Sequence, residues 1–218
     1  MNKKHVKHAI CLSAAIASNF ANISIANAGG EISYNAGIVS QYLWRGFNLN
    51  NEKIAVQGGV DFEHENGIYA GIWASQYDFG DDDDGIETDL YGGYAFSLND
   101  SFWLDFSVTR YQYSGDSDAS LEWKAGIGHE FFTLNYHRDQ DLDTKYLELN
   151  SSFPLNDTWT INGHAGNNND GQENYYDYSV FVNFALSENI EWSGGYSDHE
   201  FDEKGSEGTF FFSLNASF

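Results

Sequence analysis

Residues 86–98 read IETDLYGGYAFSL, and apolar and polar side chains alternate along this stretch. Ile86, Leu90 and Leu98 share one parity, whereas Glu87 and Asp89 share the other. Because successive side chains of a β-strand point to opposite faces, this spacing predicts a strand with one apolar face and one charged face. The stretch therefore favours a sheet whose two faces meet very different surroundings.

The same two-residue period recurs along the chain, and no segment shows a convincing period of 3.6 residues. We predict twelve strands, which start near Ile32, Lys53, Ile68, Ile86, Phe102, Ser120, Phe132, Thr144, Trp159, Tyr175, Ile190 and Gly208. Five connections between them are short turns and six are longer acidic loops, and the two kinds alternate. Short turns at one end and longer loops at the other are typical of bacterial outer-membrane barrels.

Composition excludes several classes of protein. The chain has 218 residues and a net charge of -23, and 17% of its residues are aromatic. So many aromatic residues argue against a disordered acidic chain. The 33 acidic residues against ten basic ones argue against nucleic acid as a partner, because like charges repel. The single cysteine, Cys11, excludes a disulfide framework and a cysteine-based zinc or iron–sulfur site.

The first 28 residues have the features of a secretory signal peptide. Lys3, Lys4 and Lys7 make a positive start, residues 9–17 are mostly apolar, and Ala26-Asn27-Ala28 is a small-residue cleavage site. A buried N-terminal helix is the alternative interpretation. Cleavage after Ala28 would leave one domain, residues 29–218, with seven basic residues and all 33 acidic ones.

Charged residues in the middle of the predicted strands favour a membrane barrel over a soluble β-sandwich, whose strands also alternate. Asp61, Glu87, Asp89, Asp105 and Glu148 are such residues. A membrane barrel places its apolar faces against lipid and its polar faces inside, and an open edge would leave backbone groups unpaired in lipid. We therefore predict an all-β fold, a closed antiparallel transmembrane β-barrel of about twelve strands.

Aromatic residues gather near the predicted strand ends, where membrane barrels carry girdles at the bilayer interfaces. The residues expected in the girdles are Trp103, Trp159 and Trp192 beside the short turns, and Tyr42, Trp44, Tyr77, Phe79, Tyr111 and Tyr113 beside the longer loops.

The third predicted strand leaves its orientation open. Tyr69, Trp73 and Tyr77 share one face, and Ile68 and Ile72 share the other. Either face is apolar enough to meet lipid.

Four further segments carry a second kind of signal. They are residues 35–46 (NAGIVSQYLWRG), 55–61 (AVQGGVD), 67–75 (GIYAGIWAS) and 87–94 (ETDLYGGY). In this order they resemble the TorF-type porins, the Gcw_chp domain family of proteobacterial outer-membrane proteins. Gln41 stands where this family often has Asp, and Ile54 where it often has Pro. The resemblance implies an outer-membrane protein, and a channel as its activity.

On the channel interpretation, the polar faces line the lumen. The predicted pore-lining residues are Gln41, Arg45, Gln57, Asp61, Glu63, Glu87, Asp89, Glu122, Lys124, Glu148 and Asp177, and the same faces carry Asn135, His137, Asn162, His164 and Glu191. Acidic groups outnumber basic ones in this set, and such a wall attracts cations and repels anions.

Arg45 is one of the seven basic residues that would remain after cleavage, and it lies in a segment that carries the resemblance. We expect it to pair with carboxylates of the second or fourth predicted strand and to organise or narrow the lumen. A purely structural ion pair is the alternative. The first longer loop is expected over residues 48–52, and no loop looks long enough to fill the lumen.

The longer loops hold 17 of the 33 acidic residues. These carboxylates could form a cation funnel or a weak calcium or magnesium site, but a solvated acidic surface is the simpler interpretation. We expect no metal site and no cofactor. We also expect no enzyme, since the chain has no Gly-x-Ser-x-Gly motif, and His137 and His164 in a lumen would not reach bilayer lipid.

The sequence thus predicts an exported outer-membrane channel for passive diffusion of small solutes, with a preference for cations. The alternative is a non-conducting barrel with a structural or adhesion role through its acidic loops. The expected partners are outer-membrane lipid and lipopolysaccharide, small solutes or cations, and the barrel-assembly machinery. The last of these would recognise the final strand, which ends in Phe218 behind alternating apolar residues.

Overall fold

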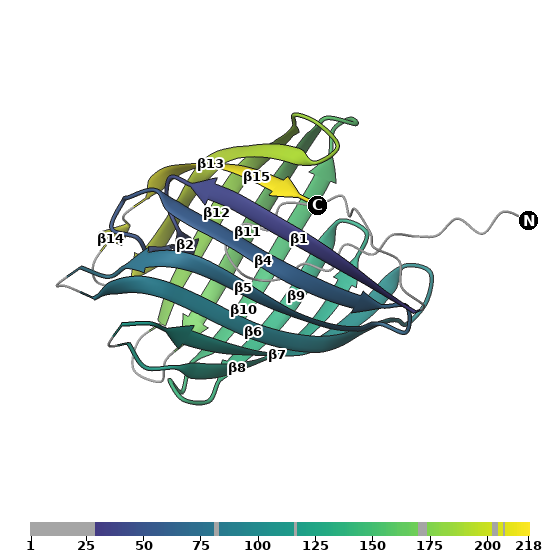
Figure 1. Ribbon diagram of the computed structural model, residues 1–218, viewed down its shortest axis with the longest axis horizontal. Helices are drawn as coiled ribbons and strands as arrows, with labels where there is room; N and C mark the ends of the chain where they lie inside the picture. Colours follow the sequence, from purple (N-terminus) through teal and green to yellow (C-terminus); the bar gives the residue numbers. More distant parts are fainter. Residues whose placement is uncertain (1–28, 81–82, 116, 170–173, 202–204, 207) are drawn as a thin grey trace, which may run out of the picture.

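The computed structural model describes residues 29–80, 83–115, 117–169, 174–201, 205–206 and 208–218 (Figure 1). These residues form β-strands and no helix. Accordingly, the described part of the chain contains no helix with the length and apolar character needed to span a membrane. The predicted signal peptide, residues 1–28, lies outside the described residues.

Twelve strands pair antiparallel with their neighbours in sequence, and the last pairs with the first, which closes a barrel (Figure 1). The wall strands are β1 (Gly30–Val39), β4 (Ala55–His64), β5 (Ile68–Asp78), β6 (Asp84–Ser97), β7 (Phe102–Tyr113), β8 (Ser120–His129), β9 (Phe132–Asp139), β10 (Lys145–Pro154), β11 (Trp159–Asn169), β12 (Asn174–Ala185), β13 (Ile190–Phe201) and β15 (Thr209–Ser217). The predicted fold class is confirmed, and each predicted strand start lies within two residues of an observed one.

The seam of the barrel lies between β1 and β15. Asn35 pairs with Ser217 and Val39 with Ser213 in this register. The backbone N–H of Phe218 donates to the carbonyl of Tyr34 at 2.8 Å, and the N–H of Tyr34 donates to the carbonyl of Phe218 at 2.9 Å. These bonds leave neither strand as a free edge, which a membrane barrel requires.

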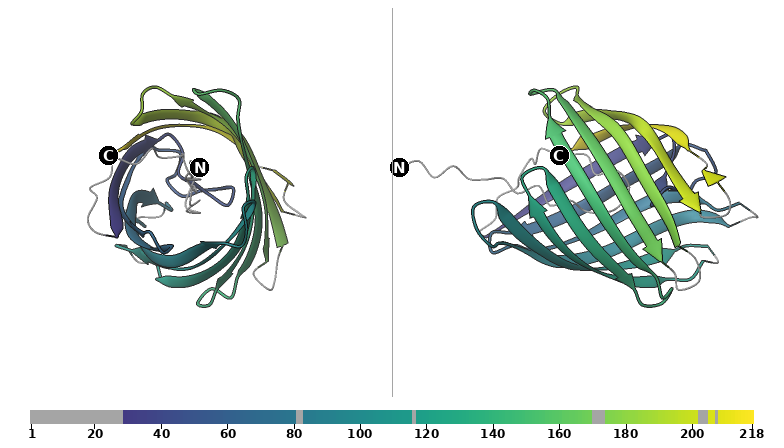
Figure 2. Two further views of the ribbon diagram at one scale, coloured as in Figure 1. Left: turned by 90° about the vertical axis from the view of Figure 1, so that its right-hand side faces the viewer. Right: turned by 180° about the vertical axis from the view of Figure 1, so that it is seen from behind.

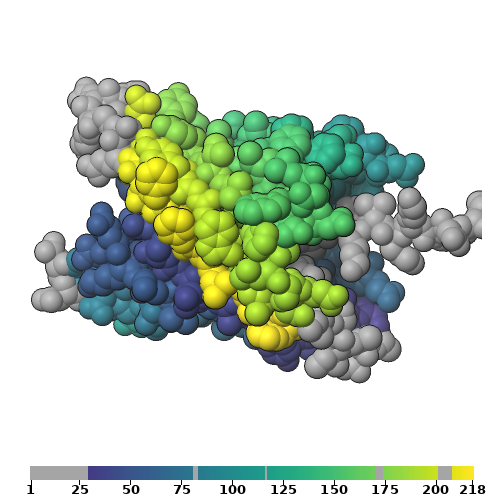
Figure 3. Space-filling view, turned by 90° about the horizontal axis from the view of Figure 1, so that it is seen from above, coloured from purple at the N-terminus to yellow at the C-terminus, as the bar shows by residue number. Residues whose placement is uncertain are grey.

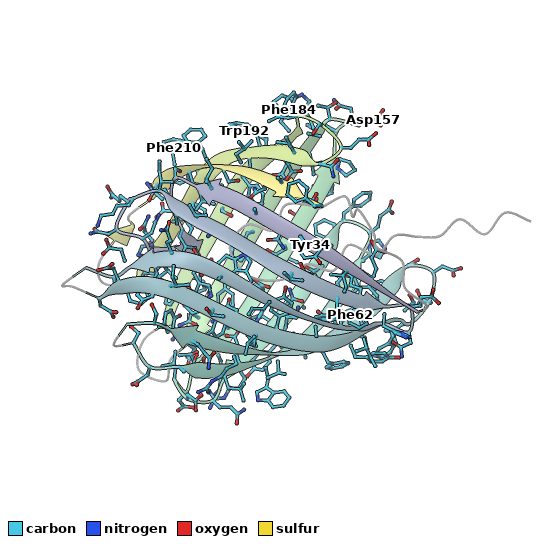
Figure 4. All side chains as sticks on the ribbon, viewed as in Figure 1. Tyr34, Phe62, Asp157, Phe184, Trp192 and Phe210 are labelled. Carbon is cyan, nitrogen blue, oxygen red and sulfur yellow. The ribbon has the colours of Figure 1, made fainter. Side chains whose placement is uncertain are left out.

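The outer face is apolar and the inner face is polar. On β10, Leu147 and Leu149 are 46% and 47% exposed, whereas Tyr146 and Glu148, which alternate with them, are buried. Figure 4 shows Phe184, Trp192 and Phe210 pointing away from the barrel. In the space-filling view of Figure 3, the side chains of β13 and β15 (yellow-green to yellow) cover this outer surface. Such an inside-out arrangement suits a barrel that is solvated by lipid.

The third predicted strand, β5, now has a defined orientation. Tyr69 and Tyr77 are buried on the inner face, and Ile68 and Ile72 are exposed on the outer face. A buried tyrosine needs a hydrogen-bond partner for its hydroxyl, and the inner face offers carboxylates. Tyr69 accordingly donates to Asp105 at 2.7 Å.

The prediction that aromatic residues near the strand ends form girdles at the bilayer interfaces is wrong at several positions. Tyr42, Tyr77 and Tyr111 are buried, and the hydroxyl of Tyr113 donates inward to Glu87 at 3.1 Å. Tyrosines near the loop ends therefore bind the acidic interior instead of facing lipid. Trp103 also lies on the inner face: its indole fills the space beside Gly128, where an added Cβ would come within 2.0 Å of it.

One connection folds inward. Residues 40–54, between β1 and β4, contain two short strands, β2 (Leu43–Trp44) and β3 (Phe47–Asn48), which pair only with each other. The left-hand view of Figure 2, along the barrel, shows this segment (dark blue) inside the ring of strands. We call residues 40–54 the lumen hairpin. It is longer than the predicted loop of residues 48–52. A further short strand, β14 (Gly205–Ser206), pairs with the end of β13.

Candidate functional site: the lumen and its hairpin

The lumen hairpin is seated on apolar side chains of the inner wall. Leu43 packs in a buried cluster with Phe181 of β12 and Phe211 of β15. The ring of Phe47 lies 5.0 Å from that of Tyr175, edge to face. Since these apolar side chains sit on an otherwise polar inner face, burying them against the hairpin stabilises its inward position.

The base of the hairpin is held by its own polar groups. The backbone N–H of Tyr42 donates to the Asn50 side chain at 2.8 Å, and the N–H of Leu49 donates to the carbonyl of Tyr42 at 2.7 Å. The N–H of Asp78 donates to the carbonyl of Leu49 at 2.8 Å, which ties the hairpin to the end of β5. Tyr42 and Trp44, expected in a girdle, are thus part of a segment inside the barrel.

The tip of the hairpin is a two-residue turn at Arg45 and Gly46. Both residues have positive φ, 49° and 84°. A two-residue hairpin turn of type I′ requires positive φ at both of its central residues. At Gly46 an added Cβ would lie 2.6 Å from the Cβ of His199 and 2.9 Å from the Cβ of Asp177, so only glycine fits. Arg45 accepts a conformation that costs a residue with a side chain about 1–3 kcal/mol.

Arg45 reaches the far wall of the barrel. Its Nη2 donates to Oε2 of Glu122 on β8 at 2.6 Å, and the two side chains are only 6% and 5% exposed. The guanidinium lies 4.1 Å from the ring centre of Tyr146 and 4.3 Å from that of Trp44. Cation–π contacts of this kind contribute about 0.5–2 kcal/mol each. The prediction that Arg45 pairs with carboxylates of the second or fourth predicted strand is wrong. The hairpin carries Arg45 across the lumen, so its partner lies on β8.

Glu122 is the first member of a chain of acidic and histidine side chains along five neighbouring strands. Each step is short: Glu122 to His137 at 2.9 Å, His137 to Glu148 at 3.2 Å, Glu148 to His164 at 3.8 Å, and His164 to Asp177 at 2.7 Å. We call these five residues the His–carboxylate chain. Alternation placed each of them inward, but only the register of β8 to β12 brings them into contact.

A second acidic group lies on β6. Glu87 accepts hydrogen bonds from the hydroxyls of Tyr42 at 2.7 Å and Tyr113 at 3.1 Å. Asp89, two residues further along the same face, is 2% exposed, and its Oδ1 is buried with no hydrogen-bond partner among the described residues. The charged form of a carboxylate is costly to bury without a partner, so a group in this position either takes up a proton or attracts a cation.

The other predicted pore-lining residues lie elsewhere on the inner side. Lys124 pairs with Asp105 at 2.6 Å. Asp61 accepts from Tyr91 and from Asn35, and Gln57 donates to Ser75 at 3.2 Å. Gln41 accepts from Asn48 within the hairpin, and Glu63 is exposed near a short turn. Whether these residues line a conducting pore stays a prediction.

Sequence reasoning missed the aromatic part of this site. Tyr111 donates to Glu122 at 3.3 Å, and Tyr146 donates to Asp177 at 2.9 Å. Both are buried on the inner face. Each lies an even number of residues from an acid on its own strand, and this spacing was the sequence signal that could have placed it inward. In the described part of the chain, no group of three or more His, Cys, Asp or Glu side chains is arranged to hold a metal ion.

The comparisons with known proteins agree with this architecture. A family model described as "Bacterial protein of unknown function (Gcw_chp)" matches residues 24–216. The chain belongs to the Gcw_chp family. The resemblance seen in residues 35–94 is thereby confirmed. No curated protein sequence matches the chain.

Solved structures of outer-membrane porins share the fold of this Gcw_chp chain. The KdgM porin in complex with disordered oligogalacturonate superposes with a TM-score of 0.59 at 12% identity, over 86% of this chain and 98% of that one. The NanC porin gives 0.57 at 12%, over 86% and 98%. The COG4313 outer membrane channel from Pseudomonas putida F1 gives 0.53 at 11%, over 89% and 96%. At these identities the likeness concerns the fold.

Proposed function

We propose that this chain is an outer-membrane channel for the passive diffusion of small solutes, and that it prefers cations. The observation that carries the preference is the charge of the inner face. The buried acidic residues there are Glu87, Asp89, Asp105, Glu122, Asp139, Glu148 and Asp177. The buried arginine and lysine described on that side are Arg45 and Lys124, and each already pairs with one of these acids.

The remaining acids give the lumen a net negative field. A lumen with low-dielectric walls concentrates such a field, so it raises the local concentration of cations and lowers that of anions. His137 and His164 offset part of this charge when they are protonated. The oligogalacturonate in the KdgM porin structure is an acidic sugar chain. The acidic interior of this chain favours solutes of the opposite sign.

The outer surface supports the proposed location. Exposed apolar side chains recur on every wall strand and would be poorly solvated by water. A lipid bilayer with lipopolysaccharide is the environment that this surface fits, and the predicted signal peptide would send the chain there. Recognition of β15 and Phe218 by the barrel-assembly machinery belongs to the same proposal.

The lumen hairpin favours a second candidate, a non-conducting barrel with a structural or adhesion role. The hairpin contacts the wall on several sides, through Tyr42 to Glu87, Arg45 to Glu122 and Leu43 to Phe181. A lumen occupied in this way conducts less than an open barrel of twelve strands would.

Single-channel recording in a planar bilayer under a KCl gradient distinguishes the two candidates. Refolded protein whose barrel is verified by heat-modifiable gel mobility should give discrete current steps and a reversal potential that favours K⁺. Asp139→Asn, which neutralises a carboxylate buried on the inner face, should lower that preference. Asp157→Asn, at a short turn outside the lumen (Figure 4), makes the same change of charge and should leave it unaltered.

Three results would count against the proposal. A reversal potential that favours Cl⁻, or equal effects of the two substitutions, contradicts a cation preference set by the lumen. Absence of current from a verified barrel supports the non-conducting candidate.

A further inference from the structure

The guanidinium of Arg45 occupies a pocket of one carboxylate and two aromatic rings. Glu122 contacts it at 2.6 Å, and the ring centres of Tyr146 and Trp44 lie 4.1 Å and 4.3 Å from its central carbon. A carboxylate combined with an aromatic face is the arrangement by which proteins bind guanidinium and alkylammonium ions. Arg45 therefore shows what kind of group this part of the lumen accepts.

The wall side of this pocket does not depend on Arg45 for its shape. Oε1 of Glu122 accepts from Tyr111 at 3.3 Å and contacts Nδ1 of His137 at 2.9 Å. The hydroxyl of Tyr146 donates to Asp177 at 2.9 Å and lies 2.9 Å from Nε2 of His164. Because these contacts run between wall strands, Glu122 and Tyr146 stay oriented toward the lumen when the hairpin is absent.

Arg45 fills the pocket incompletely. Only its Nη2 contacts Glu122, and its Nη1 is buried with no hydrogen-bond partner among the described residues. A bidentate pair would satisfy both nitrogens and bind more tightly. Its backbone, at φ 49°, is in a region that residues with side chains rarely occupy. One carboxylate contact and a strained backbone weaken the hold of Arg45 on the pocket, so a free cation at sufficient concentration competes with it.

The surroundings hold further carboxyl groups that do not pair with Arg45. Oδ1 of Asp89 is buried without a hydrogen-bond partner among the described residues, and a cation near it would supply the missing partner. Glu148 continues the His–carboxylate chain on the other side of His137. A positively charged solute entering the lumen is thus drawn toward this pocket.

We propose that the pocket formed by Glu122 and Tyr146 binds solutes that carry a guanidinium or alkylammonium group, and that Arg45 is its built-in occupant. The solute takes the place of Arg45, and the lumen hairpin moves aside as it does so. The inference rests on the proposed channel function and names the class of solute for it. The inference also assigns the lumen hairpin a role: the hairpin closes the path through the lumen until a suitable cation competes for Glu122.

Removal of the built-in occupant provides the test. Arg45→Ala should leave a vacant pocket that binds guanidinium from solution. The probe is millimolar guanidinium chloride, compared with sodium chloride at equal ionic strength. The readout is the temperature at which the folded band is lost in heat-modifiable gel mobility. We expect a saturable upward shift with guanidinium for Arg45→Ala. Wild type should shift in the same direction only at higher guanidinium concentration, because Arg45 competes for the pocket, and the double variant R45A/E122Q should show no shift.

Two matched measurements make the result specific. Arg110→Ala removes another paired arginine, whose partner Asp141 lies 3.3 Å away at the exposed surface, and should respond to guanidinium as wild type does. In bilayers, guanidinium should reduce the current through the Arg45→Ala channel in a saturable way and leave that of R45A/E122Q unaffected. If no variant conducts, the channel proposal fails, while the gel shift still reports whether the pocket binds the cation.

The opposite results are equally clear. An Arg45→Ala barrel that responds to guanidinium and sodium alike overturns the proposal, and so does a shift that survives Glu122→Gln. If Arg45→Ala does not fold by itself, its refolding yield becomes the readout. Restoration of the yield by guanidinium and not by sodium supports the pocket, whereas failure of both salts contradicts it.

Discussion

Nη2 of Arg45 and Oε2 of Glu122 are 2.6 Å apart, although 77 positions separate the two residues in the sequence. Arg45 belongs to the connection that leaves β1, and Glu122 lies on β8. Four wall strands separate β1 from β8 on one side of the ring and six on the other. The contact therefore crosses the lumen. It attaches the tip of the lumen hairpin to the acidic wall opposite β1.

Arg45→Ala should weaken the barrel. Removing one partner of a buried ion pair costs about 3–5 kcal/mol in general. His137 and Tyr111 still contact Glu122 in this variant, so we expect a loss at the lower end of that range, about 3 kcal/mol in the free energy of unfolding. Urea unfolding in lipid vesicles, followed by tryptophan fluorescence, measures this loss. Arg110→Ala breaks an exposed pair and should cost about 0–1 kcal/mol. Equal losses in the two variants would mean that the Arg45 pair is not buried in the membrane-inserted protein.

Gly46→Ala should displace the lumen hairpin without changing any charge. Its added Cβ would lie 2.6 Å from the Cβ of His199, at a backbone φ of 84°. Single-channel conductance should therefore rise. Gly80→Ala is the matched control: its φ is 81°, but nothing lies within 4 Å of an added Cβ. It carries the same backbone strain and should leave conductance unchanged, and a similar rise in both variants would show that hairpin seating is not the cause.

Asp89→Asn and Asp105→Asn should affect stability differently. Asp105 pairs with Lys124 at 2.6 Å and accepts from Tyr69 at 2.7 Å, so its neutralisation leaves a buried lysine uncompensated and costs about 3–5 kcal/mol. Asp89 has no such partner among the described residues, so its neutralisation should be neutral or stabilising in urea unfolding. A large loss for Asp89→Asn would reveal a partner or ion that binds it in the membrane.

Leu149→Arg should be costly because Leu149 faces outward in the middle of β10. A charged residue on the lipid face of a membrane barrel costs about 2–4 kcal/mol at the midplane and about 0–1 kcal/mol near the interface. Leu155→Arg, at the short turn beyond the same strand, serves as the control for depth and should be tolerated. Urea unfolding in lipid vesicles measures both, and equal costs would argue against a bilayer around this face.

The amino-acid sequence alone determined the wall of the barrel. Alternation between Glu87 or Asp89 and the apolar residues beside them is a local property, because successive side chains on an extended chain point in opposite directions. It therefore gave the strand positions and the inward orientation of Glu122, His137, Glu148 and the other acids. Tyrosines near the strand ends were harder to place, since a phenol suits a lipid interface as well as a buried carboxylate.

Only the tertiary structure decided what fills the lumen. The segment Leu43-Trp44-Arg45-Gly46-Phe47 has no alternation that distinguishes an inward hairpin from an exposed loop. It turns inward because Phe181 and Phe211 provide apolar contacts on the inner face and Glu122 provides a carboxylate. Those residues lie far away in sequence and come within reach of the hairpin only when β1 and β15 close the ring. The partner of Arg45 is thus a consequence of barrel closure, which no local pattern encodes.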